Sequence, residues 1–273
     1  MPDPTMPTSH PAEIVLIDGP DAVAFAQSQF SSNVTSLANG HWQFSAWLDA
    51  QGRVRTLFHL ARLNDEHLVL LLRGGNAATM ADALRRFVFR SRVSLDAPAS
   101  WMLGTGPSQP LNTVDTNSST VRLGCDTHSM LLGTNVIGDD AWRQPQLHSG
   151  WPWLPPTALD ELLPPALSLH RLQAVAIDKG CYPGQEIVAR MHYRGGHKRH
   201  MHHVLLSQHV DAGAVLRHGD RELARVLDVT TQENNFVEAL VVMQDDIASQ
   251  VAQGVANVTD NGIRIDLRTS WPA

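Results

Sequence analysis

The chain contains few lysines and few cysteines. Of its 21 Lys and Arg residues only two are lysines, and it has 2 cysteines, Cys125 and Cys181. Two cysteines in a chain of 273 residues do not form the disulfide framework of a small secreted domain. We therefore expect a protein of a reducing, cytoplasmic compartment.

Long hydrophobic runs are also missing from the sequence. The run Leu68–Leu72 is far too short to cross a bilayer, and the N-terminus lacks the cationic and apolar regions of a signal peptide. The net charge is −6, whereas binding to nucleic acid usually needs a broad basic face. We therefore expect neither a membrane nor a nucleic acid as a direct partner.

The basic residues that are present gather in one segment. Between Asp178 and His203, five Lys or Arg residues stand against two Asp or Glu, and both lysines, Lys179 and Lys198, lie there. A cationic island in an acidic protein favours a small anionic ligand. From charge alone, the alternative is a solvated basic loop beside a buried cysteine.

Apolar spacing and turn residues predict an α+β fold. A short strand before Asp18-Gly19-Pro20 is followed by a helix that opens at Pro20-Asp21. Three strands are expected over 42–72, and Asn76 is expected to cap a helix that runs to Phe89. This order of elements predicts a sheet layered against helices.

The chain divides into several small domains by composition. We expect an N-terminal α+β domain over 13–96 that is completed by 141–198. Residues 97–140, rich in Pro, Gly, Ser and Thr, predict a small second subdomain. Short apolar runs between Gly and Asp turns over 199–273 predict a C-terminal β-barrel.

Cys181 is the candidate reactive group. Gly180 and Gly184 allow a tight turn around it, and Pro183 suits the first position of a helix. A helix dipole and the neighbouring Lys179 would both favour the thiolate form. The alternative is a buried structural cysteine, which is the commoner fate of this residue type and the one we expect for Cys125.

Histidines and tryptophans form two further clusters. The histidines have no carboxylate or cysteine at ligand spacing among them, so we expect no metal site there. They are His192, His197, His200, His202 and His203. The tryptophans Trp142, Trp151 and Trp153 could stack on a flat heteroaromatic ligand, although such residues more often pack in a core.

One long motif resembles a known family. Residues 179–190 read KGCYPGQEIVAR, and Arg194-Gly195 and Lys198-Arg199 follow. This stretch resembles the signature of the YgfZ branch of the folate-binding YgfZ/GcvT superfamily. The segments around Gly19-Pro20-Asp21, 48–54 and Gly150-Trp151-Pro152 are also similar to that family, and the resemblance covers about residues 13–200 clearly.

The resemblance implies a GcvT-like arrangement of small domains that binds tetrahydrofolate. It implies work in the assembly or repair of iron–sulfur enzymes, with an indirect effect on tRNA modification. Iron–sulfur client enzymes or assembly factors are then the expected partners. The residues implied are Cys181 and Lys179 for reactivity and, for folate, Trp142, Tyr182, Gln185, Glu186, Arg190, Arg194 and Lys198.

The sequence departs from the family pattern at several positions. Ala12 stands where the family has a second tryptophan, and Pro165 and Ser168 replace a glutamine and an asparagine. Residues 53–57 contain no carboxylate, although the aminomethyltransferases of the superfamily place a catalytic Asp there. A folate-dependent aminomethyl transferase and a folate-sensing interaction module with a structural Cys181 remain the alternatives.

Overall fold

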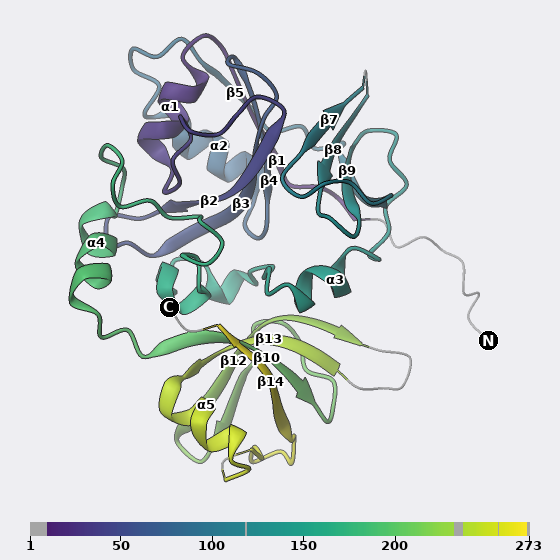
Figure 1. Ribbon diagram of the computed structural model, residues 1–273, viewed down its shortest axis with the longest axis vertical. Helices are drawn as coiled ribbons and strands as arrows, with labels where there is room; N and C mark the ends of the chain where they lie inside the picture. Colours follow the sequence, from purple (N-terminus) through teal and green to yellow (C-terminus); the bar gives the residue numbers. More distant parts are fainter. Residues whose placement is uncertain (1–9, 118, 232–236, 256, 272–273) are drawn as a thin grey trace.

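The structure is a computed structural model that describes residues 10–117, 119–231, 237–255 and 257–271. It is an α+β fold of three antiparallel sheets and few helices (Figure 1). The N-terminal sheet lies at the top of Figure 1 and the C-terminal sheet at the bottom, and the segment 141–182 runs between them. The α+β class expected from the sequence is confirmed, whereas the expected domain boundaries stay a prediction.

The N-terminal sheet has five strands in the order β2-β3-β4-β1-β5. They are β1 (Ile14–Asp18), β2 (His41–Leu48), β3 (Val54–Arg62), β4 (His67–Leu72) and β5 (Ser94–Asp96). Both faces are buried, since Leu71 packs toward the segment 141–182 and Leu70 toward the helices. This explains why β4 is apolar at nearly every position instead of alternating.

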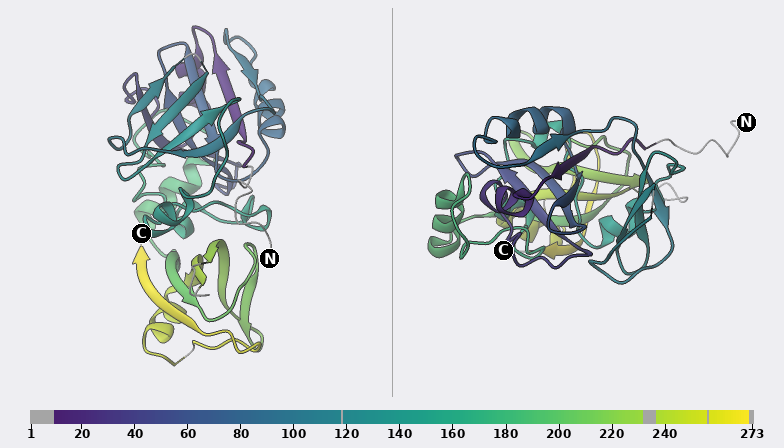
Figure 2. Two further views of the ribbon diagram at one scale, coloured as in Figure 1. Left: turned by 90° about the vertical axis from the view of Figure 1, so that its right-hand side faces the viewer. Right: turned by 90° about the horizontal axis from the view of Figure 1, so that it is seen from above.

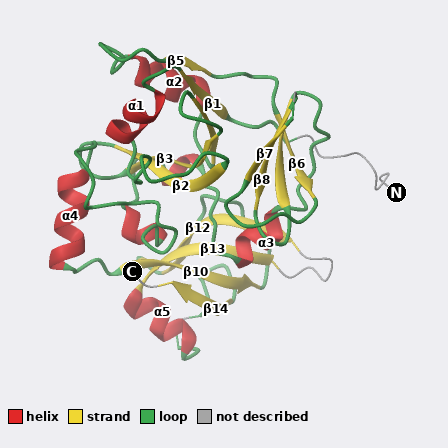
Figure 3. Ribbon diagram, turned by 45° about the horizontal axis from the view of Figure 1, so that its top comes forward, coloured by secondary structure: helices red, strands yellow, loops and turns green. Residues whose placement is uncertain are grey.

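Two helices cover the outer face of this sheet, α1 (Ala22–Gln29) and α2 (Ala77–Arg85) (Figure 3). The expected cap is present, because the Asn76 side chain accepts a hydrogen bond from the Thr79 backbone N–H at 2.9 Å. The expected end at Phe89 is wrong. Leu84 is the last buried residue of the helix and Phe89 is 86% exposed, so Phe89 adds no buried contact that would extend the helix.

The second sheet has four strands in the order β6-β9-β8-β7. They are β6 (Met102–Gly106), β7 (Val114–Thr116), β8 (Thr120–Gly124) and β9 (Ser129–Gly133). It is joined to the N-terminal sheet by Trp42, whose indole N–H donates to the Gly124 carbonyl oxygen at 2.8 Å. This bond holds the end of β8 against β2.

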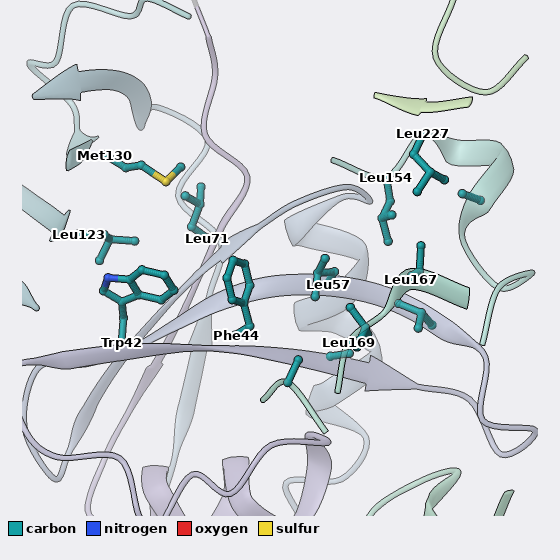
Figure 4. Packing of buried hydrophobic residues seen from close by; sticks show 14 of the residues in the cluster. Trp42, Phe44, Leu57, Leu71, Leu123, Met130, Leu154, Leu167, Leu169 and Leu227 are labelled. Atoms are coloured by element: carbon teal, nitrogen blue, oxygen red, sulfur yellow. The ribbon is translucent and has the colours of Figure 1, made fainter. Parts of the chain in front are cut away.

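The segment between the sheets contains α3 (Arg143–His148) and two short 3-10 turns, Pro156–Ala158 and Pro164–Leu167. Its side chains complete a continuous core. Figure 2 shows the backbone of this segment from the side, as a layer between the sheets. Figure 4 shows Trp42, Leu123 and Leu227, one from each sheet, in this core. The helix α4 (Gln185–Arg194) then lies at the outer edge of the layer.

The C-terminal sheet has five strands in the order β11-β12-β13-β10-β14. Its elements are β10 (Arg199–Leu206), β11 (Val215–His218), β12 (Arg221–Thr231), β13 (Val237–Gln244), α5 (Asp245–Ala252) and β14 (Ile265–Trp271). Leu240 faces the segment 141–182, and Val241 packs with α5 on the other face. Closure of this sheet into a barrel stays a prediction. Among the described residues, no helix is both long and apolar enough to cross a membrane.

Candidate functional site

The motif 179–186 meets the hairpin turn between β2 and β3. Gly184 is the N-cap of α4 and has a φ of +78°. A β-carbon on Gly184 would lie 2.5 Å from the carbonyl oxygen of Asp49 and 2.8 Å from the α-carbon of Gly52. Only glycine suits both this backbone conformation and this close approach. The fold therefore joins two segments that the resemblance singles out separately in the sequence.

Lys179 holds this motif against the chain that follows α1. Its ammonium group donates hydrogen bonds to the carbonyl oxygens of Phe30 at 2.5 Å and Ser32 at 2.7 Å. It also lies 4.9 Å from the centre of the Tyr182 ring, and burial lowers the pKa of Lys179 to about 8. Among the contacts of the described residues, none joins Lys179 to Cys181, so the structure gives the lysine an anchoring position.

Cys181 is exposed on a loop whose neighbours are fixed. The buried Tyr182 donates its hydroxyl to the Ala176 carbonyl oxygen at 3.0 Å. The Gln185 side chain donates to the Lys179 carbonyl oxygen, also at 3.0 Å. These two bonds tie residues after Cys181 to residues before it and so brace the loop, while the thiol itself faces solvent.

The helix α4 presents a cationic face beside this loop. Ile187, Arg190, Met191 and Arg194 follow the spacing of one helix face and line an open cavity of about 350 Å³ together with Gly195. Arg190 and Arg194 are exposed, and no carboxylate of the described residues lies within 4.0 Å of either guanidinium. Unpaired arginines in a shallow cavity can bind an anion.

Two other charged residues of the predicted site are also exposed. Glu186 lies in the first turn of α4, where a carboxylate is favoured by the helix dipole. Lys198 lies after the end of α4, and its backbone carbonyl accepts a hydrogen bond from Asp245 at 2.9 Å. Both side chains are available to a ligand or partner on this edge of the molecule.

Trp142 is buried in the layer between the sheets. Its side chain is 3% exposed, and its indole N–H donates to the Asp139 carbonyl oxygen at 2.8 Å. Its ring packs on Trp153 with 5.0 Å between the centres. Trp151 and Trp153 are only half buried, so these two rings, and not Trp142, are partly open to a ligand.

Arg73 lies at the centre of this aromatic group and is fully buried. Its guanidinium donates to the Gln146 side-chain oxygen at 2.6 Å and to the Pro152 carbonyl oxygen at 2.9 Å. It also stacks over the Trp153 ring, 4.7 Å from the centre. Burial lowers the pKa of Arg73 to about 9, while the nearby Asp228 carboxylate opposes this shift.

The predicted site residues therefore fall into two groups. Cys181, Lys179 and the residues of α4 lie at one end of the segment 141–182, and Trp142 lies at the start of α3 at the other end (Figures 1 and 3). The structure does not bring Trp142 into contact with the motif 179–186 in the part of the chain that it describes. Any one ligand that uses both groups has to extend along the layer.

Three residues of the histidine cluster, together with His170, line a second cavity beside α4. This cavity has a volume of about 400 Å³ and is lined by His170, His192, His197 and His200, with Met191. His200 bonds through Nδ1 to the Asp245 carboxylate at 2.6 Å. The carboxylate comes from the start of α5, so it lies outside the histidine-rich segment 192–203.

Comparison with known proteins identifies the family. No model of a protein family matches the chain. An uncharacterized protein of Haemophilus influenzae is 31% identical over 196 residues, which cover 69% of each chain. The tRNA-modifying protein YgfZ of Aliivibrio fischeri strain MJ11 is 27% identical over 215 residues, covering 69% of this chain and 67% of that one. The YgfZ of Sodalis glossinidius is 24% identical over 275 residues, with 86% and 84% covered.

This chain belongs to the YgfZ branch of the YgfZ/GcvT-like superfamily. The fold agrees with that of a solved structure, the glycine cleavage system aminomethyltransferase T from Bartonella henselae. The TM-score is 0.66 at 14% sequence identity, and 85% of this chain and 76% of the other are covered. The family expected from the motif 179–190 is thus confirmed.

The sequence of this YgfZ-family chain gives little sign of the Arg73 network. The one signal is that a charged residue directly follows the apolar strand β4, before Gly74-Gly75. His59 Nε2 lies 3.3 Å from the Arg73 guanidinium, and the His59 ring stacks on Trp42 at 4.5 Å. These residues come from neighbouring strands, so only the sheet order places them together.

Proposed function

We propose that the chain is a tetrahydrofolate-binding accessory protein for the assembly or repair of iron–sulfur enzymes. It acts in the cytoplasm and affects tRNA modification indirectly, through its clients. The observation that carries the proposal is the exposed Cys181 thiol, held on a braced loop beside the exposed arginines of α4. Membership of a family whose relatives are named tRNA-modifying proteins supports it.

The residues of the aromatic group fit a pterin. A pterin is flat and has a polar edge, so it needs aromatic faces together with hydrogen-bonding groups. The indole N–H of Trp153 and Nδ1 of His59 are buried without a partner among the described residues. Because Trp151 and Trp153 are half buried, we assign the pterin to these rings. Trp142 packs against Trp153 and helps to fix the position of its ring.

The acidic tail of the folate is assigned to α4. Arg190, Arg194 and Lys198 stay the predicted contacts, because they are exposed and the cavity beside the two arginines is open. Since α4 lies at the opposite end of the layer from Trp142, the tail has to extend along it. A folate with several glutamates should then bind more tightly than one with a single glutamate.

When bound, the folate would supply one-carbon or redox chemistry from its pterin end, and the arginines of α4 would hold its acidic tail beside the Cys181 loop. Cys181 can bind iron as a soft ligand or react with an electrophilic sulfur or oxidant. Lys179, Tyr182 and Gln185 keep the loop in one conformation, so that the thiol is presented to a client. Exposure of Cys181 is what allows a second protein to reach it.

Folate binding is tested by tryptophan fluorescence. Tetrahydrofolate should quench the wild-type protein saturably, and Trp153→Phe should bind more weakly. Trp47→Phe is the matched control, because Trp47 packs with the opposite face of the N-terminal sheet. The double variant Arg190→Gln/Arg194→Gln should no longer bind a folate with several glutamates more tightly than one with a single glutamate. Equal binding by wild type and Trp153→Phe would place the pterin elsewhere.

The cellular function is tested by rescue of a deletion strain. Cells that lack the protein should lose activity of iron–sulfur enzymes, most strongly under oxidative stress. Cys181→Ser should fail to rescue them, because a hydroxyl is neither a soft ligand nor a comparable nucleophile near neutral pH. Cys125→Ala, which changes a buried thiol, is the control and should rescue. Full rescue by Cys181→Ser would favour the interaction-module alternative.

The aminomethyltransferase alternative makes a distinct prediction. No Asp or Glu lies between Gly52 and Arg62, so the position that manages a proton in the transferases is missing. We expect no methylene transfer from an aminomethylated carrier to tetrahydrofolate. Measurable transfer would replace the accessory-protein proposal with an enzymatic one.

A further inference from the structure

Two histidines and a glutamate converge between α3 and the C-terminal sheet. His148 is the last residue of α3, His203 lies on β10 and Glu238 on β13. One ligand atom from each of the three residues lies within 4.8 Å of the other two. None of these residues belongs to the site assigned to folate or to the thiol.

The register of the sheet produces this arrangement. His203 on β10 stands directly opposite Leu240 on β13, and Glu238 precedes Leu240 by two residues. Side chains two apart on a strand point to the same face, so His203 and Glu238 are diagonal neighbours on the face toward the segment 141–182. His148 reaches the pair from α3, which packs on this face.

The distances place the three donor groups within reach of one ion. His148 Nε2 lies 2.7 Å from one Glu238 carboxylate oxygen, and His203 Nε2 lies 3.9 Å from the other. His203 Nε2 is buried and has no hydrogen-bond partner in the described part of the chain. Its ring centre is 5.5 Å from that of His148. The group thus has three nitrogen or oxygen donors directed at one small region.

The buried carboxylates at the two ends of α3 have different partners. There, Arg143 donates to the buried Asp228 at 2.8 Å, so a permanent cation neutralises the carboxylate. At the end of α3, the charged partners that the structure gives the buried Glu238 are two imidazoles. Buried carboxylates are paired or coordinate metals, and imidazole is the commonest metal ligand among side chains.

We propose that His148, His203 and Glu238 bind one divalent transition-metal ion, of which Zn²⁺ is the best match, and that this ion links α3 to the C-terminal sheet. Two imidazoles and one carboxylate are a common donor set for zinc. Bonds of about 2.0–2.2 Å require small movements of the side chains. The His148 side chain, 47% exposed, can make them and leaves a coordination position open to water.

The proposal is tested by metal titration of the full chain after removal of bound metal with a chelator. Calorimetry with Zn²⁺ and visible absorption with Co²⁺ should both show one ion per chain. His148→Gln should weaken binding at least about tenfold, because it removes one of three protein ligands. Glu238→Gln should do the same while keeping the shape of the side chain. His218→Gln is the control, since His218 is an exposed histidine beside Asp260, outside the group.

Two further variants separate this site from its rivals. His197→Gln tests the histidine cavity beside α4 and should leave zinc affinity unchanged. His148→Arg keeps a cation for Glu238 but cannot bind metal, so it should abolish zinc binding and the zinc-dependent rise in Tm that metal linkage predicts. Wild-type protein that binds no zinc, or His148→Gln that binds it as tightly as wild type, would overturn the proposal. These readouts need no folate and no client, so they are independent of the proposed function.

Discussion

Gly184 and Gly52 touch across the junction between the motif 179–186 and the β2–β3 hairpin. A β-carbon on Gly184 would stand 2.8 Å from the Gly52 α-carbon and 2.5 Å from the Asp49 carbonyl oxygen. A β-carbon essentially never makes contacts this short, so a side chain on Gly184 has to push the hairpin away from α4. The position of the Cys181 loop therefore depends on this contact.

Gly184→Ala should destabilise the protein by about 1–3 kcal/mol, because it combines a steric clash with a φ of +78° that Ala rarely adopts. The shift in the urea midpoint measures it. Gly180→Ala is a matched control in the same motif, since a β-carbon there would meet nothing within 4 Å. Equal stability of the two variants would contradict the close contact.

The two cysteines should differ sharply in reactivity. Cys181 is exposed, whereas Cys125 is buried and burial raises the pKa of its thiol to about 12. Native protein should therefore react rapidly with one equivalent of a disulfide reagent and with a second only after unfolding. Cys181→Ser should remove the rapid phase and Cys125→Ala should leave it. A rapid phase that survives Cys181→Ser would show that the burial pattern is wrong.

Arg73→Met should be among the most destabilising single substitutions in the chain. It removes a fully buried guanidinium that bonds Gln146 and Pro152, leaving their oxygens without this donor. We expect a loss of about 3–5 kcal/mol, as for a broken buried charge network. Urea unfolding measures it, with Arg86→Met, an exposed arginine at the end of α2, as the control. A loss under about 1 kcal/mol would mean that the network adds little.

Local signals predicted the elements that depend on nearby residues. Asn76 caps α2 because its side chain bonds a backbone group three residues on, and the glycines at 52 and 184 mark positions where the backbone needs positive φ. The end of α2 was not predictable from apolar spacing, because Phe89 has the right position in the sequence but packs against no element. Spacing identifies residues that could be buried, and tertiary contact decides which are.

The site was predictable only in part for the same reason. Residues 179–194 are contiguous, so Cys181, Arg190 and Arg194 could be named as candidates from the sequence. The Arg73 network, and the group of His148, His203 and Glu238, combine residues from separate strands and helices. Sheet order and strand register bring these residues together, and neither is encoded by any local pattern.

The lowered pKa of Lys179 should appear in the pH dependence of stability. Burial lowers the pKa of this ammonium to about 8, from a usual value of 10.5. Below about pH 8 both the folded and the unfolded chain carry the proton, and above 10.5 neither does. Between these values the unfolded chain binds a proton that the folded chain does not, so the free energy of unfolding should rise with pH across this window.

Lys179→Met should remove this rise and lower stability below pH 8 by about 1–3 kcal/mol, because the hydrogen bonds to Phe30 and Ser32 are lost. The sequence supplies its own control, since Lys198 is the other lysine and is exposed. Lys198→Met should keep the wild-type profile of urea midpoint against pH. If the two variants show the same profile, the rise does not come from Lys179. In that case the hydrogen bonds to the Phe30 and Ser32 carbonyl oxygens offset the effect of burial on the pKa of Lys179. The ammonium then stays charged, and the anchoring of the Cys181 loop does not depend on pH.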